Sequence, residues 1–551
     1  MGIQPLVHGG RSTLGSTHNE EIGFTHGLPS ASDQHFADGL ARVTLSTMET
    51  DPGTADKSVA QEATAIAGGS AIVMAGGIVE RAVRMLTTWF LSGALGTAGF
   101  GLYAFATTVA SIVGAIAPLG MDAGLIMYGA RYRASNEAGR LKGVLLTGLG
   151  TVALSGPMFA IAAWALVRTE LILADRPDEG TALVTISAGI VLVAVFSVLL
   201  GALVSAKDMV GQTLSQLIAL PCVLLVGSMA AVWTGLGVDG VIMAFVLAHA
   251  VAVVMAALRV WKRDGGLLRD RSVLPQLELA ALFGYALPQS FARVLYRANL
   301  WVDILMLTAL ATLADVGVYR VSVALAMMGA LPVVASTTMF GPVIAELVYT
   351  DQREKLNALL KIVTRWLLVV ATPLYFGILL LPDVVLSIFD EAYLGGVGAL
   401  LILMSGQAIY VLAAPTGAIL TNAGHSTLNL INGLIAVGLN IALNAWLIPV
   451  HGLIGAAVAS ATALGIWSLL RVVAVYWLHR CHAFSWRAAI FVGGMATLGL
   501  CVHAPLLDLN WIVRVCAVAG LALIGLVLFW IFARTEADEA VLARVRTRLG
   551  R

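Results

Sequence analysis

The chain has few charged residues. Only 12% of its 551 residues are charged, whereas a soluble protein carries roughly 25%. Hydrophobic residues make up 59% of the chain, and its mean hydropathy is +0.89. This deficit of charge indicates that most of the surface meets lipid. The formal net charge of +1 gives no overall field that would attract nucleic acid, so we expect no nucleic-acid partner.

Cysteines and signature motifs are also scarce. The chain has 4 cysteines, and their spacing matches neither a CxxC pair nor a metal site, so we interpret them as small apolar side chains. No Walker loop, HExxH or GxSxG pattern is present, and this argues against an ATPase or a membrane hydrolase. We therefore predict no disulfide framework, no metal, no cofactor and no enzymatic activity.

Long apolar runs begin at about residue 66. Each is about 20 residues long, the length that a helix needs to cross a bilayer. Basic residues gather in the loops after the even-numbered runs, which predicts an even number of spans with both termini in the cytoplasm. We expect a multi-pass protein of the bacterial inner membrane. The fourteen predicted spans are 66–92, 100–128, 142–167, 181–205, 212–234, 239–261, 278–309, 315–341, 357–381, 395–421, 427–448, 452–478, 487–506 and 511–533.

The two ends of the chain differ from the apolar region. Residues 1–65 are polar and predict a disordered cytoplasmic tail, whereas residues 534–551 form a basic cytoplasmic tail. The basic tail has helix-like apolar spacing, which fits either a helix on an anionic leaflet or a solvated helix. Between the tails we expect a first lobe at 66–261, a second lobe at 262–478, and two further spans at 479–533.

The two lobes have the marks of an internal repeat. Arg81 precedes Tyr103 by 22 residues, and Arg297 precedes Tyr319 by the same interval, with the two arginines 216 positions apart. Six spans per repeat is an even number, so both copies enter the membrane from the same side. This predicts an all-α integral membrane fold in which two six-helix lobes are related by a pseudo-twofold axis along the membrane normal.

Arginines inside apolar spans carry the functional hypothesis. An arginine at membrane depth costs at least about 2.5–3.5 kcal/mol, so it is retained where it faces protein or water. Arg81 and Arg84 lie within about 60° of each other on one helix face, and Arg293 and Arg297 are one turn apart in the seventh span. Guanidinium groups bind phosphate oxygens in pairs. We therefore expect these four residues to line a central cationic cavity and bind a diphosphate.

Each of these two spans also carries a carboxylate, Glu80 or Asp303. One interpretation is that they pair with the arginines and hold the lobes together. The other is that they couple or gate transport by binding H⁺ or Na⁺, since a carboxylate in a low-dielectric cavity can take up a proton on one side only. The residues alone leave both interpretations open.

Several sequence strings point to a known family. They are Leu95-Gly-Thr-Ala-Gly-Phe-Gly-Leu-Tyr103, Val316-Gly-Val-Tyr319 after Asp303, Pro415-Thr-Gly-Ala-Ile-Leu-Thr-Asn-Ala-Gly424, and Asn440-Ile-Ala-Leu-Asn444-Ala-Trp-Leu-Ile-Pro449 with His451-Gly-Leu-Ile-Gly455. With these strings the chain resembles the polysaccharide-transport branch, which includes the O-antigen flippases, of the multidrug/oligosaccharidyl-lipid/polysaccharide exporter superfamily. The long polar N-terminus and His451 depart from the family pattern.

The resemblance implies two six-helix bundles around a V-shaped cavity, with two extra C-terminal helices. It also implies that the protein flips a polyprenyl-diphosphate-linked oligosaccharide to the outer leaflet, with Arg81, Arg84, Arg293 and Arg297 as the positions that fit diphosphate contacts. The expected partners are this lipid-linked glycan, membrane lipid and polysaccharide polymerase or assembly proteins. Two alternatives stay open: an ion-coupled multidrug antiporter of the same superfamily, and a non-transporting scaffold of a polysaccharide assembly complex.

Overall fold

The computed structural model describes residues 52–168, 177–333, 352–422, 426–481 and 509–530, with isolated positions between 340 and 350 and between 490 and 505. The chain divides into two units, Met1–Gly68 and Gly69–Arg551, and the contacts below lie within the second. The predicted tails at 1–65 and 534–551 fall mostly or wholly outside the described residues. A helix begins at Pro52, inside the stretch that the sequence assigns to the N-terminal tail.

The described residues form helices and connecting turns, without strands, and this confirms the predicted all-α class. A membrane favours this solution because each helix satisfies its own backbone hydrogen bonds. In the first half the elements are α2 (Pro52–Ile116), α3 (Met121–Gly124), η1 (Leu125–Gly129), α4 (Ala130–Ala134), α5 (Ala138–Arg168), α6 (Pro177–Ser205), α7 (Met209–Gln212), η2 (Thr213–Ala219), α8 (Leu220–Trp233) and α9 (Gly237–Arg269).

The second half has a similar series of long helices with short elements between them. They are α10 (Leu279–Leu310), α11 (Leu313–Met328), α13 (Arg353–Leu380), α14 (Pro382–Ser387), η3 (Glu391–Gly396), α15 (Val397–Asn422), α16 (Ser426–His479) and α18 (Trp511–Leu528). Most of the predicted span 487–506 lies outside the described residues.

Helix α16 contains two of the predicted spans, and α2 contains one span and most of the next. Helix α2 kinks at Gly96, where φ is 66°, and α16 kinks at Gly452, where φ is 52°. Glycine adopts positive φ without steric cost, so these residues allow the chain to turn between spans. Within the described residues, 9 helices are long and apolar enough to cross a membrane, with both kinked helices counted once. The predicted number of fourteen spans stays a prediction.

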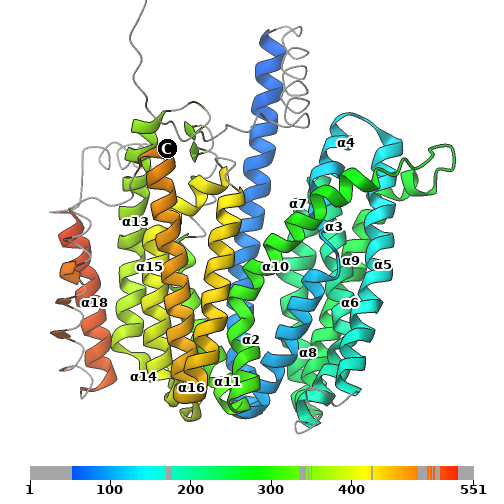
Figure 1. The fold of residues 1–551 in the computed structure, drawn as a ribbon. Coiled ribbons are helices and arrows are strands. Elements are labelled where there is room, and N and C mark those ends of the chain that lie inside the picture. The colour runs from blue at the N-terminus through cyan, green and yellow to red at the C-terminus, as the bar shows by residue number, and fades with distance from the viewer. Residues whose placement is uncertain are drawn as a thin grey trace, which may run out of the picture. The chain divides into compact units, whose positions relative to one another are not determined.

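The long helices form two packed groups. In one group α6 packs against α5 and α9, and α8 packs against α9; in the other, α15 packs against α11, α13 and α16. Figure 1 shows α5, α6, α8 and α9 side by side, and α13, α15 and α16 side by side. Helix α10 contacts both α3 and α16, so it links the two groups. Pro288 lies inside α10, and because proline has no backbone N–H, the helix lacks one hydrogen bond there.

The connection from α9 to α10 is attached to the first group. Lys142 on α5 donates to the Asp270 carbonyl at 2.6 Å, and Arg140 Nε lies 2.9 Å from the Glu278 carboxylate. Arg133 also makes two hydrogen bonds to Asp264, at 2.8 and 2.7 Å. We refer to this end of the bundle, defined by Arg133, Arg140 and Lys142, as the basic end.

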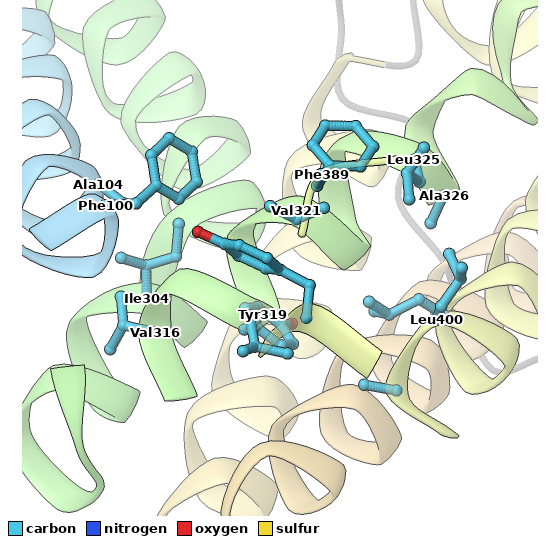
Figure 2. Close-up of a cluster of buried hydrophobic side chains, with 14 of the residues drawn as sticks. Phe100, Ala104, Ile304, Val316, Tyr319, Val321, Leu325, Ala326, Phe389 and Leu400 are labelled. Carbon is cyan, nitrogen blue, oxygen red and sulfur yellow. The ribbon is translucent and has the colours of Figure 1, made fainter. Parts of the chain in front are cut away.

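A buried hydrophobic cluster joins the two groups. It includes Phe100 and Ala104 on α2, Ile304 on α10, and Val316 and Tyr319 on α11. Figure 2 shows the Tyr319 ring directed between side chains from these helices. Tyr319 is 1% exposed, and Tyr103, which has the equivalent position in the first repeat, packs partly buried against the same cluster.

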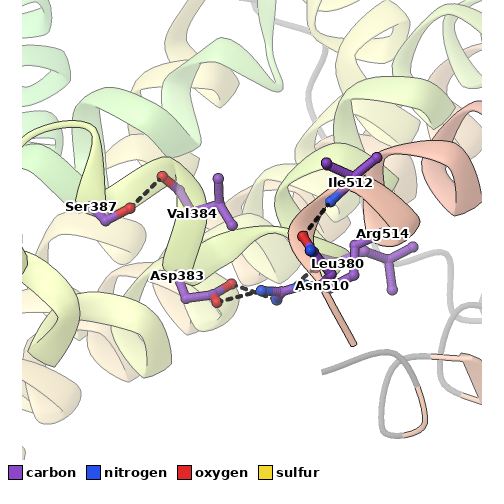
Figure 3. A network of polar contacts seen from close by, with 7 residues as sticks. All are labelled: Leu380, Asp383, Val384, Ser387, Asn510, Ile512 and Arg514. Carbon is purple, nitrogen blue, oxygen red and sulfur yellow. Dashed lines mark hydrogen bonds and ion pairs between the residues drawn. The ribbon is translucent and has the colours of Figure 1, made fainter. Parts of the chain in front are cut away.

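Helix α18 is held at one end by a buried arginine. Arg514 donates to both carboxylate oxygens of Asp383, at 2.8 and 2.7 Å, and to the Leu380 carbonyl at 3.4 Å. Figure 3 shows this arrangement, with Asn510 capping the start of α18 beside it. The arginine side chain is 7% exposed, so the pair fixes the position of α18 against α13 and α14.

Candidate functional site

The first half of α2 has two chemically different exposed sides. Arg81 and Arg84 are exposed on one side, and the apolar residues Val79 and Leu86 are exposed on the other. At about 100° per residue, the two sides point away from each other around the helix. Arg81 and Arg84 therefore share a face, and it differs from the one that carries these apolar side chains.

The carboxylate of Glu80 belongs to the arginine face. Arg84 Nε lies 2.5 Å from Glu80 Oε1, with the glutamate side chain 18% and the arginine side chain 57% exposed. Arg81 instead donates to the Gly77 carbonyl of its own helix at 3.3 Å. Glu80 therefore pairs with an arginine of the same helix, one turn away, and does not connect the two repeats. One of the two positive charges on this face is left uncompensated by Glu80.

Helix α10 carries the other predicted arginines. Arg293 and Arg297 lie on α10 as expected, but their side chains fall outside the described residues. Whether they meet the α2 arginines therefore stays a prediction.

Asp303, also on α10, is buried in a polar network. Its side chain is 3% exposed. It accepts a hydrogen bond from Asn444 Nδ2 at 2.7 Å and another from the Ser460 hydroxyl. Asn444 also donates to Asn440 at 2.7 Å, and the Tyr319 hydroxyl lies 3.0 Å from that of Ser460. The network thus draws on α10, α11 and both halves of α16.

The Asp303 network contains no described cation. Among the side chains that the structure describes, no lysine, arginine or histidine forms an ion pair with Asp303. Its surroundings are neutral amides and hydroxyls, whose oxygen atoms are the ligands preferred by hard cations. No group of three or more His, Cys, Asp or Glu residues that could hold a metal occurs in the described part of the chain. The arrangement can hold a proton or a monovalent cation at a single carboxylate.

The sequence analysis missed the partners of Asp303. Asn440 and Asn444 are both 0% exposed, although they appear in the sequence only as part of a family string. Their spacing of four residues within an apolar helix places both amides on one face, and two buried amides require hydrogen-bond partners. That signal could have identified them as site residues.

Arg320 is a further cation that the sequence analysis missed. It follows Tyr319 on α11, and its guanidinium carbon lies 4.1 Å from the centre of the Trp301 ring. Arg320 lies on α11 and Trp301 on α10, so this contact places a cation of the second repeat beside the first helix of that repeat. The argument that identified Arg81, an arginine within an apolar span, applies equally to Arg320.

The two repeats make a reciprocal backbone contact at the end opposite the basic end. A Cβ placed on Gly101 would lie 1.9 Å from the Leu313 carbonyl oxygen and 3.0 Å from the Gly317 nitrogen. A Cβ placed on Gly317 would lie 2.0 Å from the Thr97 carbonyl oxygen and 3.2 Å from the Gly101 nitrogen. Gly101 and Gly317 are separated by 216 positions, the same interval as Arg81 and Arg297. The pseudo-twofold axis of the repeat therefore passes between these two glycines.

Two longer side chains reinforce this contact. The Trp89 indole donates to the Ile388 carbonyl at 2.8 Å, and the Tyr393 hydroxyl donates to the Ser92 carbonyl at 3.1 Å. Both bonds run between α2 and the segment from α14 to η3. Helices from the two repeats are thus held together at this end by backbone packing and by side-chain hydrogen bonds.

The fold and the site together define a multi-pass membrane transporter fold built from two repeats. The sequence profile of the polysaccharide biosynthesis protein family matches residues 66–348, and the chain belongs to that family. It lies in the polysaccharide-transport branch of the multidrug/oligosaccharidyl-lipid/polysaccharide exporter superfamily, as its sequence resemblance predicted. No curated protein matches the chain in sequence.

Solved transporter structures share the fold. The lipid II flippase MurJ in an inward closed conformation superposes with a TM-score of 0.66 at 14% identity, covering 84% of this chain and 99% of that one. An inward-facing multidrug resistance MATE family transporter has a TM-score of 0.63 at 15% identity, covering 75% and 98%. A superfamily transporter from Pyrococcus furiosus has a TM-score of 0.54 at 16% identity, covering 76% and 94%.

Proposed function

We propose that this protein carries a polyprenyl-diphosphate-linked oligosaccharide across the bacterial inner membrane by alternating access. The observation that carries the proposal is the exposed arginine face of α2, where Arg81 and Arg84 lie beside a single described carboxylate, Glu80. Arg320 of the second repeat, which lies over the Trp301 ring, is a third described arginine, so the three cations exceed the charge of Glu80 by two. Two positive charges remain for a ligand, and these match the charge of a diphosphate diester.

Guanidinium groups suit this ligand because each can donate two hydrogen bonds to a pair of phosphate oxygens and stays charged at any working pH. The prenyl tail of such a substrate can remain in lipid, while its sugars need a polar path. The same excess of positive charge disfavours export of organic cations, which calls for acidic groups. The family match to polysaccharide biosynthesis proteins and the fold shared with a lipid II flippase support a lipid-linked substrate.

The basic loops indicate which end of the protein faces the cytoplasm. We place the basic end in the cytoplasm, because basic loops remain on that side during insertion. The Gly101–Gly317 contact then closes the outer end, and the substrate enters from the inner leaflet. Outward release requires these two glycines to separate, together with the Trp89 and Tyr393 hydrogen bonds.

We propose that Asp303 couples this cycle to a cation gradient. Its network spans α10, α11 and α16, so binding H⁺ or Na⁺ at the carboxylate would change the packing of three helices of one lobe. Helix α10 contacts the other lobe through α3 and can transmit that change. Glu80 lies beside the arginines and is better placed to compete with the substrate for them.

The decisive experiment uses purified protein in proteoliposomes. A fluorescent polyprenyl-diphosphate disaccharide is the probe, and its transfer between leaflets is measured by the loss of access to an impermeant quencher. We expect transfer by the wild type, and a loss of about 10- to 100-fold in Arg84→Ala or Arg320→Ala, since a hydrogen bond to a charged group contributes about 1.5–3 kcal/mol.

Two comparisons make the experiment specific. A polyprenyl-monophosphate disaccharide should be transferred more slowly than the diphosphate by the wild type, and the two rates should converge in the arginine variants. Lys355→Ala, which removes an exposed charge on α13, is the matched control and should retain the wild-type rate. Equal transfer by the wild type, Arg84→Ala and Arg320→Ala would show that these arginines do not bind the diphosphate.

A further inference from the structure

A basic groove lies on the outside of the first helix group, between the start of η2 and the last turns of α9. Its volume is about 250 Å³, and it is lined by Gly211, Leu214, Met255, Leu258, Arg259 and Lys262. Helix η2 uses Thr213 and Leu217 to pack against Gly76 of α2. Leu214 points into the groove from another side of η2. The groove is therefore separate from the arginines proposed to bind the transported substrate.

The charge in the groove is incompletely balanced. Arg259 Nη1 lies 3.8 Å from Asp208 Oδ2, which is too far for a hydrogen bond. The other oxygen of Asp208 accepts from the Gly211 nitrogen at 2.8 Å and caps α7. Among the described residues, no carboxylate forms an ion pair with Lys262. Two cations thus share one carboxylate, and the groove retains one positive charge.

An apolar lane continues from the groove along α9. Leu258, Val254 and Leu247 are 62%, 56% and 55% exposed, and their spacing of four and seven residues places them on one side of the helix. Such a row of exposed apolar side chains faces lipid in a membrane protein. Cationic groups at one end of an apolar lane match the shape of a phospholipid, which has one phosphate above its acyl chains.

The level of the groove in the membrane also fits a lipid headgroup. Trp261, between Arg259 and Lys262 in sequence, is 47% exposed, and the Arg269 guanidinium carbon lies 4.5 Å from the centre of its ring. Exposed tryptophans gather where the membrane meets water. Arg259 and Lys262 therefore lie at the level of the phosphates of the leaflet at the basic end.

We propose that this groove is a binding site for an anionic phospholipid of that leaflet, with Arg259 and Lys262 contacting the phosphate and the α9 lane contacting an acyl chain. Basic pockets between membrane helices are known to hold anionic headgroups. The cations could also attract free phosphate, but the apolar lane next to them favours a lipid.

The test measures lipid binding to the purified full-length protein after delipidation. Phosphatidylglycerol and phosphatidylcholine are titrated separately, each with and without millimolar inorganic phosphate, and the bound lipids are counted by native mass spectrometry. We expect the wild type to prefer phosphatidylglycerol to phosphatidylcholine. The double variant Arg259→Gln/Lys262→Gln should lose about twentyfold of that preference, since each basic residue near a membrane surface adds about a factor of five.

Two further variants separate this site from general surface charge. Arg271→Gln/Lys355→Gln removes the same two residue types from exposed positions outside the groove and should change the preference less than about twofold. Asp208→Asn keeps a side chain that can cap α7 but removes the competing carboxylate, so it should strengthen phosphatidylglycerol binding. Unchanged unfolding temperature and a single gel-filtration peak serve as the folding check for each variant.

Three results would overturn the proposal. The first is equal binding of phosphatidylglycerol by the wild type and the Arg259→Gln/Lys262→Gln variant. The second is equal affinity of the wild type for phosphatidylglycerol and phosphatidylcholine. The third is displacement of phosphatidylglycerol by millimolar inorganic phosphate, which would identify the groove as a site for a free anion.

Discussion

The first helices of the two repeats, α2 and α10, carry acidic residues in contrasting environments. Glu80 on α2 lies on an exposed face and pairs with Arg84 of the same helix. Asp303 on α10 is buried, and its partners come from α16. The comparison shows that the repeats differ: α2 exposes its charges, whereas α10 holds a carboxylate inside its own lobe.

The repeats remain equivalent where they touch each other. Gly101 and Gly317 occupy the same repeat position, and each packs against the backbone of the other copy. A contact on a pseudo-twofold axis imposes the same steric limit on both partners. Away from the axis each copy meets different neighbours, and there the equivalent residues are free to differ.

The largest effect is expected at the glycine contact. Gly101→Val or Gly317→Val places a side chain where a carbonyl oxygen lies about 2 Å away. Overpacking of this kind costs several kcal/mol, so the closed outer end should be disfavoured and transport should fall about 100-fold. The measurement is the rate of glycan transfer, together with labelling of an introduced cysteine at Ser92 by an impermeant thiol reagent in a cysteine-free background.

The control for the glycine variants is Gly150→Ala on α5, where an added Cβ meets no atom within 4 Å. It should retain transport and low labelling. If Gly101→Val left both the transfer rate and the Ser92 labelling at wild-type values, the contact would not be part of the transport cycle.

A second prediction separates the two carboxylates. Asp303→Asn should abolish the dependence of transport on a Na⁺ or H⁺ gradient and lower the driven rate about tenfold or more, because the amide keeps hydrogen bonding but cannot bind the cation. Glu80→Gln should keep the gradient dependence and lower the KM for the diphosphate probe, because it frees Arg84. The rate of transport, measured with and without an imposed gradient, distinguishes the two variants. Loss of gradient dependence in Glu80→Gln instead would reverse the assignment.

A third prediction concerns the equivalent arginines Arg81 and Arg297. If both bind the diphosphate, each alanine variant should raise the KM about tenfold with a smaller change in kcat. The double variant shows whether the two act on the same ligand, because coupled residues deviate from additivity. A normal KM in Arg297→Ala would restrict the substrate cations to α2 and α11.

The smallest effect is expected at α18. The Arg514 guanidinium donates hydrogen bonds to Asp383 and so lowers the pKa of that carboxyl below its ordinary value. A lowered pKa in the folded protein contributes stability above the ordinary pKa, and this contribution is lost as the pH falls through the lowered value. The thermal unfolding temperature should therefore drop by a few degrees on acidification below about pH 4.

Arg514→Met serves as the matched variant for the α18 prediction. It should unfold at a lower temperature than the wild type at pH 7, and the difference should narrow in acid. Transport should change little, since the pair lies away from the substrate arginines. A difference in unfolding temperature that stays constant from pH 7 to pH 3 would show that the arginine stabilises α18 by packing alone.

The sequence predicted some features of the site because their causes are local. The shared face of Arg81 and Arg84 follows from helix geometry, and the turns at Gly96 and Gly452 separate apolar runs that were recognised by length. The hydrogen-bond partners of Asp303 could not be predicted in this way. Asn444 and Ser460 lie 141 and 157 positions from it, and nothing in the spacing of α10 indicates which helix covers that face.

By itself, the sequence determined that the chain is an all-helical membrane protein with an internal repeat. Lipid offers no hydrogen bonds, so each apolar run must satisfy its own backbone as a helix, and this depends only on composition and length. The tertiary structure alone decided what surrounds the buried carboxylate. Placing Asp303 among the amide of Asn444 and the hydroxyl of Ser460 depends on how helices pack, and that is fixed by side-chain contacts between segments far apart in the chain.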